Sequence, residues 1–443
     1  MTRVWQRLGL VRPELRAWAM YVWANSAMAA TIVTAVFPVY YGQVACQGLP
    51  PAVATQRHAL ATTLALLCVA FSAPFLGALA DARPWKKRFL AGFMSAGILA
   101  CAGMFFVGPG DWLLGAALFC IANIGASGSF VFYDALLPHV ARPQEMDRVS
   151  AAGYALGYLG GGLLLLFDVA LIRFPTWFGL PDPAAGGSAA TLPTRLAFVS
   201  VAVWWLLFAL PLLRRVPEPP LNVHARRTGA VRDAFGQLRH TIAALRHHRH
   251  AGLMLVAFLL YNDGILTIIR MSTIYGSEIG LPTNQLLLAI LIVNFVGVPF
   301  AVLFGVLAGR IGAKRAIHYA LALFACISYI GYRLSSPAEF FLLALLVSMV
   351  LGGTQALSRS LFASMIPKSR SSEFFAFFAV AEKFAGLLGP ALFAVLIAST
   401  GSSRAAVLAT VGFFVVGALL LARVDVTAGR SAAAADSVEG AAS

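Results

Sequence analysis

The most evident shortage in this 443-residue sequence is charge, because only 12% of its residues are Asp, Glu, Lys or Arg. Soluble globular proteins carry about 25% charged and about 45–50% apolar residues. Here 60% are hydrophobic and the mean hydropathy is +0.81. The shortage excludes a water-soluble enzyme and disfavours a disordered chain.

Cysteine is also scarce, with five residues in the whole chain. Four lie within apolar runs and the fifth stands alone, so their spacing predicts neither a disulfide framework nor a metal site. The eight histidines are scattered, and the run at 247–250 has no acidic or cysteine companion. We therefore expect no metal and no bound cofactor.

Acidic residues are the rarer charge, 18 against 33 basic ones, which gives a net charge of +15. A basic protein that binds nucleic acid exposes its charge on a soluble surface. Here the basic residues stand between long apolar runs, so we expect no nucleic-acid partner and look to a membrane for the explanation.

Long apolar runs are abundant. A helix needs about 20 apolar residues to cross the hydrocarbon core. Twelve runs of suitable length are present, at 17–41, 58–80, 89–108, 112–137, 150–172, 196–213, 251–275, 285–309, 316–332, 338–365, 374–398 and 405–421. They predict an all-α, polytopic membrane protein with twelve transmembrane helices.

The basic residues predict the orientation, since Lys and Arg are retained on the cytoplasmic side. Twenty-five of the 33 fall on one side of the predicted spans, five on the other and three within spans. Both termini are therefore expected in the cytoplasm. The excess of Arg over Lys and the many alanines suggest a GC-rich bacterial genome, and thus a multi-pass protein of the bacterial inner membrane.

The chain divides into five predicted regions. They are a cytoplasmic N-terminal segment (1–16), a six-helix bundle (17–213), a cytoplasmic linker (214–250), a second six-helix bundle (251–422) and a disordered cytoplasmic tail (423–443). Within the linker, apolar residues recur at helical spacing between 231 and 245 with arginines on another face. This pattern predicts an amphipathic helix on the membrane surface.

The two bundles share sequence features at nearly one offset. Residues 77–88 correspond to 305–315 at an offset of 228, and Leu137-Pro138 corresponds to Ile366-Pro367 at 229. We infer two pseudo-symmetric halves, although chance recurrence of Gly and Ala is the alternative. Parallel repeats of this kind are typical of transporters that rock about a central site.

The stretch from Gly77 through Asp81 to Lys86, Lys87 and Arg88 resembles the signature loop of the major facilitator superfamily. Phrases at 23–26, 125–138, 154–162, 261–264 and 355–362 further resemble its bacterial "unknown major facilitator" branch. That branch is similar to the fungal vacuolar effluxer linked to autophagy, which is thought to release amino acids. Two departures are Gly309, where a complete second loop has Asp, and Pro84, where a turn Gly is usual.

The resemblance implies a gating role for the loop. Asp81 would lie near the N-terminus of the eleventh span, where the helix dipole favours a carboxylate. Lys86, Lys87 and Arg88 would engage carboxylates and lipid phosphates, and these contacts would latch the halves in the outward-open state. The alternative is that the basic cluster is only a topology signal.

Polar residues inside spans are costly and therefore informative. They concentrate in the first, fourth, seventh and tenth spans, which in this repeat arrangement would line the cavity. The candidates for substrate binding or coupling are Asn25, Asn123, Tyr133, Asn262, Asp263, Arg270, Gln355, Arg359, Glu382 and Lys383.

Asp263 lies at the middle of the seventh span, so it is expected to receive a substrate amine or to carry a coupling proton. Arg359 would donate to a substrate carboxylate. The alternative is a structural salt bridge between Asp263 and either Arg359 or Arg270. Glu382 and Lys383 are adjacent, so we expect them to point apart rather than pair, and Asp134 is expected to be a gate partner for a loop arginine.

Together these observations predict a secondary active or facilitative transporter for a small polar solute. An amino acid or similar zwitterion is favoured, moved by alternating access with possible proton coupling. The alternatives are a drug exporter of the same fold and, from another class, a membrane-embedded lipid-modifying enzyme. The expected partners are the solute and the lipid bilayer, and the expected state is a monomer.

Overall fold

The computed structural model describes residues 2–182, 186–219, 248–278, 283–334, 336–385 and 403–442, with scattered positions between 386 and 402. Within these residues the regular structure is helical. The first half contains α1 (Thr2–Arg7), α2 (Pro13–Ala27), α3 (Phe37–Tyr40), α4 (Pro51–Ala82), α5 (Lys86–Gly103), α6 (Trp112–Val140), α7 (Met146–Arg173) and α8 (Leu192–Arg215). The second contains α10 (Arg249–Glu278), α11 (Thr283–Ile311), α12 (Ala313–Arg333), α13 (Pro337–Ala363), α14 (Ser371–Phe384), α16 (Ser403–Ala422) and α17 (Val426–Ala442).

Helices form here because lipid offers the backbone no hydrogen-bond partner, so each apolar run satisfies its own N–H and C=O groups. Local signals fix some of the ends. At α13, the Ser336 side chain accepts from the backbone of Glu339 while the Glu339 carboxylate accepts from the backbone of Ser336. Such a capping box, followed by Pro337 in the first turn, starts a helix efficiently.

By length and apolar composition, nine helices among the described residues could span a membrane, or ten if the bent pair Val407–Ala422 and Val426–Asp436 is one span. The predicted ninth and eleventh spans fall on α12 and α14, which are not among them. The expected total of twelve spans therefore stays a prediction, as does the side on which the termini lie.

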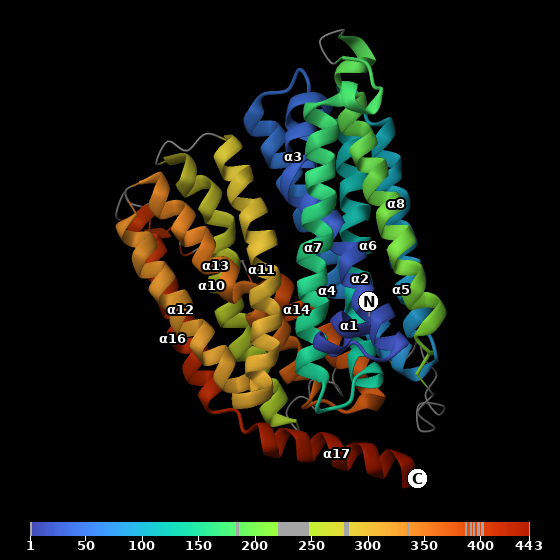
Figure 1. Ribbon diagram of the computed structural model, residues 1–443, viewed down its shortest axis with the longest axis vertical. Coiled ribbons are helices and arrows are strands. Elements are labelled where there is room, and N and C mark those ends of the chain that lie inside the picture. Colours follow the sequence, from blue (N-terminus) through green and yellow to red (C-terminus); the bar gives the residue numbers. More distant parts are fainter. Residues whose placement is uncertain are drawn as a thin grey trace.

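The two halves stand side by side (Figure 1), blue to green on the right and yellow to red on the left. Within the first, α2 packs on α7 and α8, and α5 packs on α6. Within the second, α10 packs on α16, and α13 on α11 and α12. The halves meet where α7 packs against α11 and α13, and where α14 packs against α4 and α6.

We call the end of the bundle that holds α1, the α6–α7 connection and α17 the terminal end. There Arg148 donates to the carbonyl of Gln6 (3.2 Å), and Arg12 donates to the carbonyl of Val140 (2.9 Å) and pairs with Glu145. The N-terminal segment is thus fastened to the connection between α6 and α7.

The prediction of a disordered tail at 423–443 is wrong for the part of it that the structure describes as helical. It forms α17, which runs along the terminal end (Figure 1). The tail is rich in alanine, which has the best helix propensity. Tertiary contacts also hold the helix, because Asp436 Oδ2 lies 2.9 Å from His248 Nε2 and Arg430 Nε donates to the Ser364 hydroxyl (3.2 Å). The amphipathic helix predicted between 231 and 245 lies outside the described residues.

The first predicted span is not a regular α-helix. After α2 the chain continues as a π-helix, η1 (Met28–Ala35), then α3, then a second π-helical turn, η2 (Tyr41–Ala45). The Val36 amide donates to the carbonyl of Thr31 (2.8 Å), five residues back, as a π-helix requires. π-helical segments are rare and frequently occur at functional sites.

Candidate functional site

A cavity of about 660 Å³ lies between the two halves. Its wall is mainly apolar, with contributions from α2, η1, α6 and α7 on one side and α11, α13 and α14 on the other. The polar side chains on the wall include Asn25, Ser26, Asn123, Ser127, Asn294, Gln355, Glu382 and Lys383. A concave, largely apolar site with a few convergent polar groups is typical of small-molecule binding.

Five of the predicted site residues line this cavity: Asn25, Asn123, Gln355, Glu382 and Lys383. Four others are not part of its wall, namely Tyr133, Asn262, Asp263 and Arg359. Asn262 and Asp263 are buried in α10 at 2% and 0% exposure, so α10 does not present them to the cavity. The side chain of Arg270 lies outside the described residues.

The expectation that Glu382 and Lys383 point apart is wrong. Both line the cavity, and Lys383 Nζ lies 3.9 Å from Glu382 Oε1. They occupy the last turn of α14, which ends at Phe384, and both side chains are long and flexible. Adjacent helical residues leave the helix in different directions, but two such side chains can bend toward one another at a helix end. The result is one cation and one anion together on an apolar wall.

Arg359 lies next to the cavity, on the other side of Tyr154, where a cage of polar and aromatic groups from the first half encloses it. It is 1% exposed; its Nη1 donates to Asp134 Oδ1 (2.9 Å), and its Nε and Nη2 donate to the side chain and carbonyl of Ser150 (3.0 and 3.1 Å). The rings of Trp18 and Tyr154 lie 5.0 and 4.6 Å from the guanidinium carbon. Aromatic faces and a carboxylate together stabilise a buried guanidinium.

This arrangement corrects two expectations. Arg359 is held by Asp134 rather than offered to a substrate carboxylate, and Asp134 pairs with an arginine of α13 rather than with one from a loop. Asp134 and Arg359 come from different halves, so their pairing could only be read from tertiary structure. Tyr154 connects the two regions, since its ring lines the cavity and covers Arg359.

Two more hydrogen bonds join the halves at the same depth. The Ser150 hydroxyl donates to the carbonyl of Ala356 (2.7 Å), and the Ser360 hydroxyl donates to Asp147 (2.5 Å). With the Arg359 cage they form what we call the inner closure. It consists of α6 and α7 of the first half and α13 of the second.

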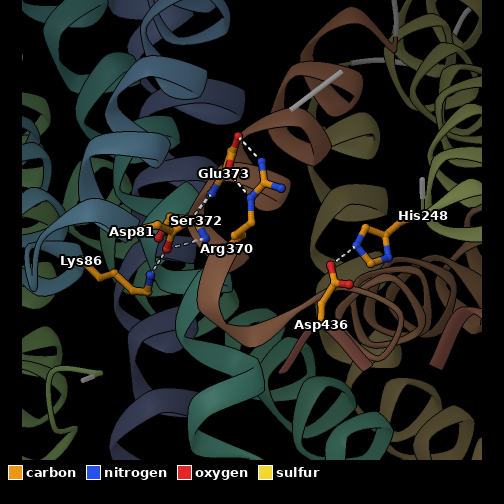
Figure 2. A network of polar contacts seen from close by, with 7 residues as sticks. All are labelled: Asp81, Lys86, His248, Arg370, Ser372, Glu373 and Asp436. Carbon is orange, nitrogen blue, oxygen red and sulfur yellow. Dashed lines mark hydrogen bonds and ion pairs between the residues drawn. The ribbon is translucent and has the colours of Figure 1, made fainter. Parts of the chain in front are cut away.

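Nearer the terminal end, the structure places Asp81 at the N-terminus of α14, as the resemblance implied (Figure 2). Its carboxylate accepts from the backbone amides of Ser372 (3.2 Å) and Glu373 (2.8 Å) and pairs with Lys86. Free N–H groups and the helix dipole favour an anion at this position. Gly77 permits the approach, because a Cβ there would lie 2.6 Å from the carbonyl oxygen of Ser372.

The two basic residues that follow Lys86 make different contacts. Lys87 donates its backbone N–H to Glu218 (3.0 Å), and the guanidinium of Arg88 lies 5.9 Å from the ring of Trp85. Only Lys86 engages the carboxylate of the latch, which we define as Asp81, Lys86 and the first residues of α14.

Arg370 adds an ion pair with Glu373 next to the latch (Figure 2). It donates to Glu373 through Nε (2.8 Å) and Nη2 (2.9 Å). Burial lowers the pKa of the Arg370 guanidinium, but the hydrogen bond and charge of Glu373 outweigh it, with help from Asp81 and Asp436, so the pKa is raised. Arg370 therefore remains a cation beside the latch, and the His248–Asp436 contact of α17 is a separate pair.

Several residues of this site were not singled out from the sequence. Trp18, Ser150 and Tyr154 complete the Arg359 cage, and Tyr158 lines the cavity. The four-residue spacing of Tyr154 and Tyr158 places them on one helix face, a signal that could have found them. Ser150 carries no such signal, because a serine at a helix start is common.

Comparison with known proteins assigns the family. Residues 52–434 match the family model described as "Vacuole effluxer Atg22 like". The chain belongs to this family. In Bacillus subtilis the uncharacterized MFS-type transporter YxiO is 34% identical over 407 residues, which cover 92% of this chain and 93% of that protein. The Autophagy-related protein 22-2 of Emericella nidulans is 28% identical over 63% of this chain, which spans half of the fungal protein's length.

Solved structures agree on the fold of this Atg22-like protein. The proton:xylose symporter XylE superposes with a TM-score of 0.66 at 16% identity, covering 96% of each chain. The transporter FucP in its outward conformation gives 0.68 at 12% identity, covering 94% of this chain and all of that one. The protein is a multi-pass membrane transporter of the major facilitator type, and its relatives are transporters rather than enzymes.

Proposed function

We propose that this Atg22-like protein moves a zwitterionic amino acid with an apolar side chain across the bacterial inner membrane by alternating access. The observation that carries the proposal is the cavity, whose apolar wall holds an adjacent anion and cation, Glu382 and Lys383. A free amino acid presents an ammonium, a carboxylate and a side chain. Glu382 would receive the ammonium and Lys383 the carboxylate.

The closed side of the cavity supports alternating access. The inner closure and the latch both join the halves between the cavity and the terminal end. The basic residues predict that the terminal end faces the cytoplasm, so this state would admit solute from outside. Transport to the cytoplasm requires the inner closure and the latch to break while the halves meet at the opposite end.

Counterflow in proteoliposomes tests the substrate. The purified protein is reconstituted with an unlabelled amino acid inside and a labelled one outside, using a panel of apolar, polar, acidic and basic amino acids. We expect exchange of apolar amino acids above the level of protein-free vesicles. Exchange restricted to charged amino acids, or none across the panel, would overturn the proposal.

Variants of the charged pair locate the site. Glu382→Gln and Lys383→Gln should each raise the KM for exchange by about tenfold or more, since a charge-assisted hydrogen bond contributes about 1.5–3 kcal/mol. Lys368→Gln is the matched control, because Lys368 is exposed at the terminal end and lies outside the cavity. An unchanged KM in both pair variants would remove the assigned roles.

The apolar wall favours one second candidate, export of a hydrophobic drug. The rings of Phe130, Tyr158 and Phe340 line the cavity and could stack on a flat aromatic solute. Hydrophobic cations added to the counterflow assay distinguish the two functions. Competition by such cations together with no exchange of any amino acid would assign the cavity to drugs.

A further inference from the structure

A buried carboxylate stands behind the cavity wall, where neither the proposed binding site nor the closures use it. Asp168 in α7 is fully buried, and both of its oxygens accept hydrogen bonds. The Thr31 hydroxyl donates to Oδ2 (2.8 Å) and the Ser200 hydroxyl donates to Oδ1 (2.6 Å). Asp168 thus joins three elements of the first half, namely α7, η1 and α8.

The groups around this carboxylate are hydroxyls rather than cations. None of the ion pairs in the described part of the chain includes Asp168. On α7 itself, Arg173 is exposed at the outer end, and on α8 Arg195 donates to the carbonyl of Phe105. The elements packed against α7 carry further charged or histidine side chains, none of which forms an ion pair with Asp168 in the described part of the chain. They are Glu14 and Arg16 of α2, Asp134 and His139 of α6, Arg214 and Arg215 of α8, Arg310 of α11, and Glu339 and Arg359 of α13, with Asp147 and Arg148 at the start of α7 itself.

A carboxylate in an apolar interior is expensive when ionised, and two hydroxyl donors offset only part of that cost. The protonated form avoids the cost but changes the hydrogen bonds. An ionised carboxylate accepts from both hydroxyls, whereas a protonated one must donate to one of them. The two protonation states of Asp168 therefore require different hydroxyl orientations at Thr31 or Ser200.

Thr31 connects this choice to the cavity. It belongs to the π-helix η1, and its neighbours Met28, Ala30 and Thr34 line the cavity while Thr31 itself is fully buried against α7. A threonine hydroxyl released from a carboxylate can donate to a carbonyl of its own helix. Thr34 already does so, donating to the carbonyl of Ala29 (2.9 Å). Weakening of the Thr31–Asp168 bond would thus favour this alternative, loosen η1 from α7 and change the cavity wall.

We propose that Asp168 is a proton-binding site that controls the π-helical wall of the cavity through Thr31. Proton binding replaces the charge-assisted hydrogen bond between Thr31 and Asp168 by a weaker neutral one and so loosens η1 from α7, and proton release restores the stronger bond. In this way the site couples protons to transport. The coupling rests on the transport function proposed above, whereas the proton binding does not.

Hydrogen exchange on the full-length protein in lipid nanodiscs tests the site without any solute. Exchange of the peptides that cover 28–35 is followed by mass spectrometry from about pH 5 to about pH 9, after correction for the intrinsic pH dependence of amide exchange. In the parent protein we expect the corrected rate at low pH to exceed that at high pH by about tenfold or more. Asp168→Asn, which is neutral at every pH, should abolish the pH dependence.

Hydroxyl variants keep the proposal testable should Asp168→Asn fail to fold. Thr31→Val removes the hydroxyl that ties η1 to Asp168, so exchange of 28–35 should be fast at every pH and the curve should be flat. Thr34→Val is the matched control, because Thr34 lies in the same π-helix and its hydroxyl donates to a carbonyl; its curve should keep the pH dependence of the parent protein. A parent-like curve for Thr31→Val, or a flat curve in the parent protein, would overturn the proposal.

Two further arms separate the alternatives. A curve that follows the sodium concentration instead of pH would reassign the site to a metal cation and overturn proton binding. In proteoliposomes, Asp168→Asn should lose accumulation driven by a pH gradient and keep counterflow. The same assay on Asp263→Asn tests the carboxylate that the sequence predicts to bind a substrate amine or carry the coupling proton. If exchange responds as proposed but no amino acid is transported, the proton site stands and the proposed substrate falls.

Discussion

The two copies of the signature loop share a glycine that permits close helix packing, but they differ at the position of the carboxylate. Gly77 and Gly305 correspond, and both allow close packing between halves: a Cβ at Gly305 would lie 2.6 Å from Ala151 Cβ. Four residues on, the first copy has Asp81, which accepts from the N-terminus of α14. The second has Gly309, and a Cβ there would meet nothing within 4 Å.

The basic residues show the same contrast. Lys86 pairs with Asp81 and so supports a contact between halves. Its counterpart Lys314 donates to the carbonyls of Ala422 and Val424 (both 2.8 Å) and so ends α16 within its own half. Both copies of the loop therefore keep the close helix packing at the glycine, whereas the first copy alone of the two forms a charged latch. Opening of the terminal end therefore breaks one loop latch together with the inner closure.

The four predictions below rely on labelling, on thermal stability or on both. Stability is measured by thermal unfolding of the purified protein. Opening of the terminal end is measured by maleimide labelling of a cysteine placed at Ala356, which is fully buried between the halves, in a chain whose own cysteines are replaced by serine.

The largest effect is expected from Asp134→Asn, which breaks the inner closure. This contact between the halves involves neither copy of the loop. The substitution leaves Arg359 buried without its carboxylate, and breaking a buried ion pair costs about 3–5 kcal/mol. The unfolding temperature should fall and labelling should accelerate. Asp147→Asn is the control, since an amide oxygen can still accept from Ser360. Parent-like behaviour of Asp134→Asn would show that the pair does not hold the halves together.

Asp81→Asn should have the next largest effect, because it makes the first loop copy resemble the second. The amide oxygen keeps one bond to α14, but the charge at the helix N-terminus is lost and Lys86 loses its partner. The closed state should weaken by about 1–2 kcal/mol, or roughly tenfold faster labelling. If labelling and counterflow both match the parent protein, the basic cluster serves topology alone.

Gly309→Asp is expected to act in the opposite direction, because it restores the missing carboxylate to the second copy. The space around Gly309 accepts the side chain, and the facing helix α7 begins nearby at Met146. Asp147 already occupies the first turn of α7, so the gain should stay below about 1 kcal/mol and slow labelling about threefold. Gly309→Asn is the neutral control. Faster labelling of Gly309→Asp than of Gly309→Asn would mean that the second loop does not face a helix N-terminus.

The smallest effect is expected from Lys314→Ala. Loss of its two bonds to the end of α16 should cost about 0.5–1 kcal/mol of stability. Labelling should not change, since the contact lies within one half. Arg315→Ala controls for the loss of a neighbouring positive charge. Accelerated labelling like that of Asp81→Asn would show that both loop copies act as latches.

The sequence allowed part of the site to be predicted for a physical reason. Asp81 is followed at short range by its partner Lys86, and its place on a helix N-terminus followed from the family loop. Asn25, Asn123 and Gln355 were found because polar groups in apolar helices are rare. Arg359 was misassigned because its partner Asp134 is 225 residues away, and either a substrate or a protein carboxylate would satisfy it.

The sequence alone determined that the chain is helical and membrane-spanning, because long apolar runs in lipid must satisfy their backbone groups locally. Its loop and repeats also determined the family. Only the tertiary structure decided which charges meet: Arg359 with Asp134, Asp81 with α14, and Asp168 with the hydroxyls of Thr31 and Ser200. Each of these pairings depends on how distant helices pack, and helix packing in lipid is set by side-chain fit rather than by any local pattern.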